Sequence, residues 1–270
     1  MRIQHNIAAI NSYRNLGINQ SALSKNLEKL SSGYRINRAG DDAAGLAISE
    51  TMRSQIAGLN QAASNANDAI GLIQTAEGAL TETHSMLQRM KTLATQSANG
   101  TYTATARKNI QQEVNDLLAE VDRIAKTTEF NEVKPLTAGN MTFQIGATGV
   151  ADNVLNLKAE DMSATGLKIN GLKVEQLSDA NGAIATIDTA INTVSTFRAK
   201  LGAAQNRMEH TVNNLKVTSE NITAAESRIR DTDMADEMTS YTKNNILMQA
   251  AQSMLAQSNA MPQGVLSMLQ

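Results

Sequence analysis

The sequence has few of the large side chains from which compact globular cores are usually built. Of its 270 residues, 3% are aromatic, and there is no Trp. Aromatic rings bury more apolar surface than other side chains, so their scarcity favours thin helix-on-helix packing. Proline, the strongest helix breaker, occurs only twice. Both features predict a chain made of long helices.

Other absences exclude whole classes of function. There is no Cys, which rules out disulfides and thiolate chemistry but leaves the redox compartment open. No apolar run reaches the roughly 18 residues that a membrane-spanning helix needs. Residues 1–6 lack the apolar core of a secretory signal peptide, so we expect any export to avoid the general secretory route. The net charge of −2 and the absence of Lys/Arg clusters argue against a nucleic-acid partner.

No arrangement of residues typical of an enzyme is found in the sequence. His5, His84 and His210 fall in three different predicted helices, and none has a second metal ligand three or four residues away. Phosphate-binding, dinucleotide-binding and serine-hydrolase motifs are missing as well. We therefore predict that the protein is not an enzyme and uses no metal or cofactor.

Two acidic clusters allow a different interpretation. Asp41-Asp42 and the group from Asp231 to Glu237 could hold a divalent cation or act as an acid–base pair. However, Asp41 stands where a helix N-cap is expected, and Arg228 and Arg230 precede the second cluster. We favour helix capping and solvated ion pairs as the explanation of both clusters.

The most prominent feature of the sequence is a heptad spacing of apolar and small residues that extends through most of the chain. It predicts long helices over about 42–98, 104–127 and 182–230, and it places Arg198 and Gln205 in the seam of the last of these. Shorter seams lie at both ends of the chain. The N-terminal seam includes Ile3, Ile7, Ile10, Leu27 and Leu30. The C-terminal seam includes Leu247, Met254, Met261 and Val265, and Leu255 lies next to it.

Several residues are expected to end or begin the predicted helices. Gly33 can adopt the left-handed conformation that terminates the first helix. Gly40 is expected to end an irregular connection, after which Asp41 caps the next helix. Asn99-Gly100 is expected to terminate that helix.

A segment from about 135 to 180 has a different spacing. Its apolar residues alternate with period two, as in Met141, Phe143 and Ile145, then Leu155 and Leu157, then Leu167, Ile169, Leu172 and Val174. Turn residues such as Asn170-Gly171 separate the runs. The segment is therefore predicted to form two small β-hairpins.

The length of the predicted helices bears on the fold class. At 1.5 Å per residue, the 42–98 helix would be about 85 Å long, whereas a compact globule of this size would be on the order of 50 Å across. Helices from both ends of the chain flank the β segment and are expected to pack beside one another. The predicted fold is mainly α: an elongated antiparallel helical bundle or coiled-coil rod with a small β-hairpin insert.

Two stretches of the sequence carry a family resemblance. Residues 30–49, LSSGYRINRAGDDAAGLAIS, resemble the N-terminal signature of bacterial flagellins, and residues 221–235, NITAAESRIRDTDMA, resemble the C-terminal one. The resemblance implies an inner coiled-coil domain made of 1–44 and 235–270. It also implies a rod domain over 45–234, without the outer variable domains of longer relatives.

The resemblance also implies a function. Flagellins are non-enzymatic structural subunits that polymerise into the extracellular flagellar filament used for swimming. The implied partners are copies of the chain itself, a flagellar export chaperone, and the filament cap and hook–filament junction proteins. Export through the flagellar type III apparatus would need no cleaved signal peptide. Two alternatives stay open: a hook–filament junction protein of the same superfamily, and an unrelated coiled-coil enzyme or adaptor.

The terminal seams are the expected assembly and chaperone-binding residues. Each carries few large side chains, so an isolated terminal helix would leave its apolar stripe in water and be marginally stable. We expect the two seams to pair within one subunit and both ends to become ordered only on polymerisation. The resemblance further implies recognition by a vertebrate Toll-like receptor, for which Arg89, Leu93 and Glu113 match the family's contact types.

Overall fold

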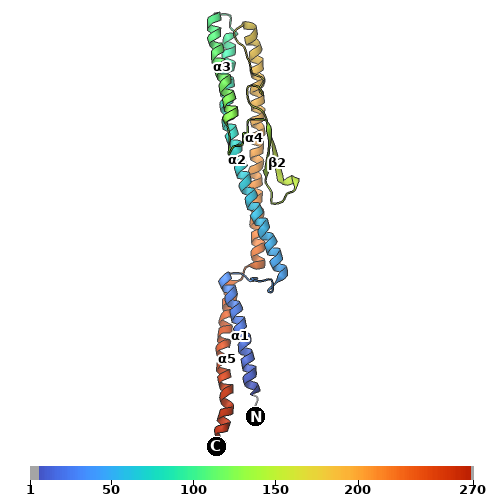
Figure 1. Ribbon diagram of the computed structural model, residues 1–270, viewed down its shortest axis with the longest axis vertical. Coiled ribbons are helices and arrows are strands. Elements are labelled where there is room, and N and C mark those ends of the chain that lie inside the picture. Colours follow the sequence, from blue (N-terminus) through green and yellow to red (C-terminus); the bar gives the residue numbers. More distant parts are fainter. Residues whose placement is uncertain (1–5, 269–270) are drawn as a thin grey trace. The chain divides into compact units, whose positions relative to one another are not determined.

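The computed structural model describes residues 6–268, without the side chains of 262, 263 and 265–268. Ile3 therefore lies outside the described residues, and the side chain of Val265 is not described. The elements are α1 (Ile7–Ser32), α2 (Ala43–Ser97), α3 (Ala104–Thr127), β1 (Gly139–Gln144), the 3-10 turn η1 (Ala151–Asn153), β2 (Val154–Ala159), α4 (Leu177–Arg230) and α5 (Met234–Met268) (Figure 1). The prediction of a mainly α fold with a small β insert is confirmed.

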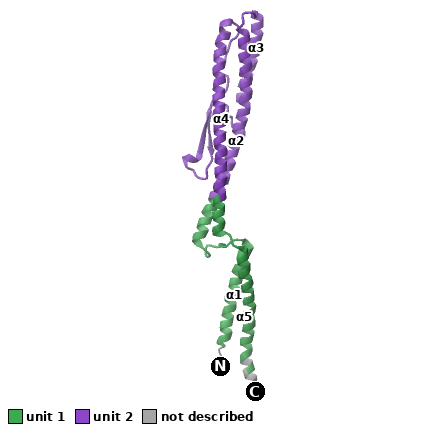
Figure 2. Ribbon diagram, turned by 180° about the vertical axis from the view of Figure 1, so that it is seen from behind, with its two compact units in different colours: residues 1–54, 221–270 green, residues 55–220 purple. Residues whose placement is uncertain are grey.

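The chain forms two compact units, which Figure 2 shows in different colours. Residues 1–54 and 221–270 make up one of them, called here the terminal unit, and residues 55–220 make up the other, called the central unit. Helices α2 and α4 contribute residues to both units.

The central unit has a continuous apolar core to which α2, α3 and α4 all contribute. Along α2, Ala69, Ala76, Leu80 and Leu87 are buried, as the heptad spacing predicted. The distance between packed helices depends on the side chains at their contact, so the alanines allow a close approach. A core can thus form with almost no aromatic residues.

The predicted seam of α4 is wrong at Arg198 and Gln205. The buried residues are Phe197 and Ala204, one position earlier in each case. Successive residues of a helix lie only about 100° apart, so a spacing of three and four residues fits either of two adjacent stripes. The Arg198 guanidinium lies on the flank of the core, 3.4 Å from the Glu77 carboxylate.

The β insert contains one hairpin. Strands β1 and β2 pair antiparallel, with Met141 opposite Leu157 and Phe143 opposite Leu155. Met141, Leu155 and Leu157 are buried in the central core. The period-two spacing therefore predicted both strands and their inner face correctly.

The second predicted hairpin is wrong. Leu167, Ile169 and Val174 are buried, but residues 160–176 form turns and bends without a strand. Their backbone makes local bonds, such as that from the Leu167 N–H to the Ser163 carbonyl at 2.9 Å. Alternating burial resembles a strand in the sequence, although no partner strand lies beside this segment.

Side chains from two helices replace the missing partner strand. The Gln111 amide accepts from the Val174 N–H at 2.6 Å and donates to the Leu172 carbonyl at 2.9 Å. The Ser97 hydroxyl donates to the Val174 carbonyl. Because buried backbone groups must be paired, these side chains allow an irregular segment to lie against the core.

Helix α4 begins earlier than the predicted start near 182. Its first residue is Leu177, and the Ala180 N–H donates to the Gln176 carbonyl at 2.9 Å. Asp179 lies in the first turn, where a negative charge interacts favourably with the helix dipole. Gly182, at the predicted start of the helix, is an ordinary helical residue.

In the terminal unit, α1 and α5 lie side by side and antiparallel (Figures 1 and 2). The Asn6 amide donates to the Ser258 carbonyl at 2.7 Å near one end of the pair. Lys29 lies 3.6 Å from Glu237 near the other end. The expectation that helices from the two ends of the chain pack together is therefore confirmed.

The connection between α1 and α2 differs from the prediction by one residue. Gly33 terminates α1 in the left-handed conformation, with φ of 74°, as predicted. The cap of α2 is Asp42, whose carboxylate accepts from the Gly45 N–H at 2.9 Å. Asp41 instead accepts from the backbone N–H groups of Arg38 and Asn37. Two adjacent aspartates offered two equally good caps, and the sequence did not distinguish between them.

Candidate functional site

The outer face of α1 is apolar and exposed. Ile7 and Ile10 are each 59% exposed and Ile18 is 60% exposed. In a helix these positions lie on the side opposite Leu16 and Leu23, which are half-buried. Aliphatic side chains on this face therefore have no partner within the described part of the chain.

Helix α5 carries a similar stripe. Leu247, Met254 and Met261 recur every seventh residue and are 41%, 61% and 50% exposed. Met248 and Leu255, on a neighbouring face, are half-buried. Methionine is flexible and polarizable, so such a stripe can adapt to more than one partner.

These exposures correct one part of the sequence interpretation. Ile7, Ile10 and Leu27 of α1, and Leu247, Met254 and Met261 of α5, are 41% to 61% exposed, so pairing of α1 with α5 leaves much of their surface uncovered. Of the predicted terminal residues, Leu30 and Leu255 are half-buried. Each helix has two apolar stripes, and the spacing alone does not reveal which of them faces the partner helix.

Backbone hydrogen bonds join the linker after α1 to the link between α4 and α5, and the structure that they form, residues 33–42 with 230–233, is called here the connector. The Arg35 N–H donates to the Arg230 carbonyl at 2.7 Å, and the Thr232 N–H donates to the Gly33 carbonyl at 3.0 Å. The linker after α1 is thereby paired with the link between α4 and α5. Residues 30–49 and 221–235, which carry the family resemblance, meet in this one structure.

Arg230 lies at the centre of the connector. Its guanidinium is 4.7 Å from the centroid of the Tyr34 ring and donates to Glu50 at 2.7 Å. The Arg35 guanidinium donates to the Ile229 carbonyl, also at 2.7 Å. The sequence predicted only a solvated ion pair for Arg230, because neither spacing nor composition indicated a contact with Tyr34.

The residues expected to contact an immune receptor differ in their accessibility. The Arg89 guanidinium donates to Glu113 at 2.8 Å, joining α2 to α3 at the surface. Leu93 is only 2% exposed and belongs to the central core. The Leu93 side chain therefore has little free surface, and it helps to hold α2 against the central core.

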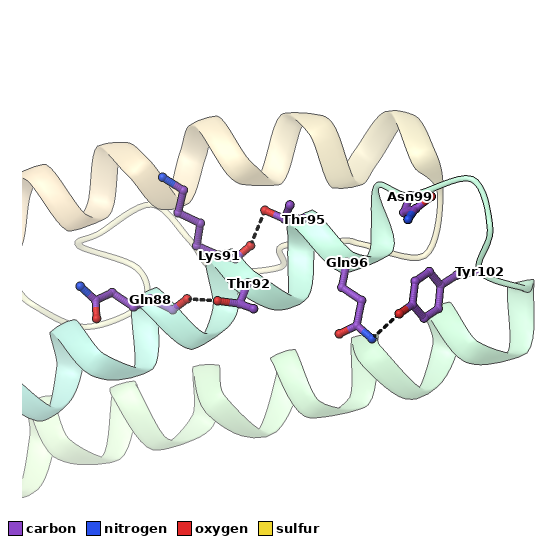
Figure 3. A pocket seen from close by; sticks show the side chains of 7 residues that line it. All are labelled: Gln88, Lys91, Thr92, Thr95, Gln96, Asn99 and Tyr102. Atoms are coloured by element: carbon purple, nitrogen blue, oxygen red, sulfur yellow. Dashed lines mark hydrogen bonds between the residues drawn. The ribbon is translucent and has the colours of Figure 1, made fainter.

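An open groove of about 710 Å³ lies along the end of α2, from Gln88 to Tyr102 (Figure 3). Its lining is polar: Gln88, Lys91, Thr92, Thr95, Gln96, Asn99 and Tyr102. The Gln96 amide donates to the Tyr102 hydroxyl at 2.9 Å, and Lys91 is paired with Asp188 of α4 at 2.6 Å. Lys91 is the charged residue among the lining residues, and its charge is paired with that of Asp188.

Among the described side chains of residues 6–268, no group is arranged to hold a metal ion. No helix within this range combines the length and the hydropathy needed to cross a bilayer.

Exposed heptad stripes on the terminal helices, together with a central unit that has its own apolar core, are typical of a helical structural protein. The bacterial flagellin N-terminal helical region matches residues 3–141, and the C-terminal helical region matches 184–269. The chain belongs to the bacterial flagellin family. It is a structural subunit of the flagellar filament.

Relatives of known identity match over their full length. The chain is 50% identical to a flagellin of Bacillus subtilis and 51% identical to one of Halalkalibacterium halodurans, each covering 100% of both chains. It is 48% identical over 285 residues to the flagellar filament 33 kDa core protein of Treponema phagedenis. A filament subunit of this family is a structural protein, which agrees with the prediction of a non-enzymatic function.

Solved structures support the fold. The crystal structure of Bacillus cereus flagellin is 32% identical, with a TM-score of 0.51 over 60% of this chain and 94% of that chain. A flagellar hook-associated protein from Vibrio parahaemolyticus shares the fold, with a TM-score of 0.60 over 71% of this chain and 100% of that chain, at 12% identity.

Proposed function

We propose that the subunit joins the filament through α1 and α5, and that the folding of these helices is completed only on polymerisation. The observation that carries this proposal is the contrast between the two units. Most large aliphatic residues of the central unit are buried in its core, whereas Ile7, Ile10 and Ile18 of α1 are more than half exposed. Outer-face residues of this kind gain burial only from another chain.

The energetics of a single helical pair favour this coupling. Ordering a residue costs conformational entropy, which burial of apolar surface must offset. The α1–α5 pair buries the side chains of few large residues, so it is marginal in an isolated subunit. Neighbouring subunits would cover the outer stripes and supply the missing burial. Contacts made by different surfaces of identical chains produce an open helical polymer when the rotation between them does not close.

A charge on the outer face tests the proposal. Ile10→Asp should prevent growth on filament seeds, because its carboxylate would be buried between subunits. The melting transition of the central unit should be unchanged, since Ile10 lies outside that unit. Gln20→Glu, which adds the same charge at an exposed α1 position on another face, is the matched control. Normal seeded growth of Ile10→Asp, measured by sedimentation, would contradict the proposal.

Before export, the same surfaces would need protection. We propose that a flagellar export chaperone binds α5 through Leu247, Met254 and Met261, and that the subunit leaves the cell through the flagellar type III apparatus. Contacts with the filament cap and the hook–filament junction proteins would use the same terminal helices. Deleting residues 235–270 should abolish chaperone binding, and retained affinity in a pull-down would argue against this surface.

We also propose that a vertebrate Toll-like receptor recognises the free subunit at the exposed Arg89 and Glu113 pair. Leu93 would contribute by packing beneath α2 rather than by contact. Arg89→Ala should weaken signalling in reporter cells without unfolding the central unit, because the ion pair is exposed. An unchanged response of reporter cells to Arg89→Ala would count against recognition at this pair.

A further inference from the structure

The contact between α1 and α5 is polar where it is most buried. Among the residues of these helices whose side chains are described, only Asn26 and Ser258 are buried, with 8% and 6% exposed. The apolar residues around them, such as Leu23 and Leu255, are only half-buried. The two most buried positions of the helical pair are thus occupied by polar residues, where apolar side chains would stabilise the pair most.

Asn26 is the less favourable of these two residues. Its amide nitrogen Nδ2 is shielded from solvent and has no hydrogen-bond partner. Removing a donor from water without giving it an acceptor opposes burial. A single Asn in the seam of a coiled coil is known to reduce stability in exchange for specificity. At this position it opposes pairing of α1 with α5 in the free subunit.

The remaining polar contacts of the pair lie at its two ends. Lys29 and Glu237 are 3.6 Å apart at the end of the pair near the connector, with side chains 31% and 12% exposed. The bond from Asn6 to the Ser258 carbonyl lies at the far end. Asn26 lies one helical turn from Lys29, where α1 and α5 are brought together by the connector. The unfavourable burial of the Asn26 amide therefore acts where α1 and α5 would first come into contact.

We propose that Asn26 sets the strength of α1–α5 pairing and keeps the two helices from pairing stably before polymerisation. This inference rests on the proposed function. In the filament, neighbouring subunits cover the outer faces of both helices, and this apolar burial offsets the free-energy cost of burying the amide. In the free subunit no such burial offsets it, so the ends stay available for export and for addition at the filament end.

The chain contains no Cys, so pairing can be measured by introduced thiols. Asn6→Cys with Ser258→Cys places one thiol on each helix at positions that are in contact. The rate at which a short thiol-to-thiol reagent links them within one free subunit reports how often α1 and α5 pair. Linked single chains are distinguished from linked dimers by their mobility in a denaturing gel.

In this background, Asn26→Leu should raise the linking rate by about tenfold or more, since it removes the unpaired amide and adds apolar area. Asn26→Ala should give a smaller increase through removal of the amide alone. Asn15→Leu, an equal change at an exposed position of α1, should link at the parental rate. The inference is overturned if neither Asn26 variant links faster than the parent.

Failure of the inference can be separated from failure of the proposed function. If the parental chain does not grow on filament seeds, the proposed function fails. If the parent grows and the Asn26 variants pair no faster, only the role of Asn26 is wrong.

Discussion

Two residues hold a strained turn in the central unit. Asn131 and Glu132 have φ of 49° and 66°, between Phe130 and Val133, which exchange two backbone hydrogen bonds. Both φ values are those of a two-residue hairpin turn, in which glycine is favoured over residues with a Cβ. Asn-Glu is not a typical turn pair, so this turn could not be predicted from the sequence.

Glu132→Gly should therefore stabilise the central unit. Relief of the left-handed strain is expected to raise the free energy of unfolding by about 1 kcal/mol. Thermal or urea unfolding of the free subunit measures the change. Glu132→Ala removes the same charge but keeps a Cβ, so it should give no comparable gain. Equal stability of the two variants would show that the charge, not the backbone, matters at this position.

Asp41 makes the connector sensitive to acid. The backbone N–H groups of Arg38 and Asn37 donate to its carboxylate and hold the pKa of Asp41 below its ordinary value. The folded state therefore favours the carboxylate. This contribution to stability is complete above the ordinary pKa, about 4, and is lost as the pH falls through the lower folded pKa. Asp41→Asn should remove this part of the acid dependence. An identical acid profile for the parent and Asp41→Asn, followed by NMR of the 34–42 backbone, would refute the assignment.

At the scale of single elements, Gln111 lets an irregular segment take the place of a strand. It is 8% exposed and bonds to both Leu172 and Val174. Gln111→Leu would leave a buried N–H and a buried carbonyl without that partner, at a cost of about 1–3 kcal/mol. The adjacent Gln112→Leu is the control, since Gln112 is exposed and bonds only within α3. Equal unfolding midpoints for the two variants would contradict this role of Gln111.

The sequence predicted helices better than it predicted the insert, for a physical reason. A helix as long as α2 repeats its burial pattern many times, so one seam position without an apolar residue does not change the prediction of a helix. The insert offers only a few apolar residues per run, and Leu167, Ile169 and Val174 are spaced like a strand although they lie in turns. What determines their structure is the partner of each backbone group, here Gln111 and Ser97, and that partner is distant in the sequence.

The terminal helices show a second limit of sequence analysis. Chain order correctly predicted that α1 and α5 pack together. The spacing did not reveal that Ile10 and Met254 would be exposed while Asn26 is buried. A residue that serves an interface between subunits has the same periodicity as one that serves the interior of its own subunit, so only the packed structure separates them.

At the scale of the whole molecule, the two units are expected to respond differently to assembly. The central unit carries its own apolar core and should fold as soon as the chain is free to do so. The helices of the terminal unit expose large aliphatic residues on their outer faces. They should therefore gain most of their stability from neighbouring subunits.

Amide hydrogen exchange compared between free subunits and sedimented filaments tests this account most directly. In the free subunit, amides of α1 and α5 should exchange at nearly the rate of an unfolded chain, while those of α2, α3 and α4 within 55–220 are protected. In the filament, the exchange of α1 and α5 should slow by orders of magnitude. Strong protection of α1 and α5 in the free subunit would show that the ends fold before they assemble, and would contradict the central claim.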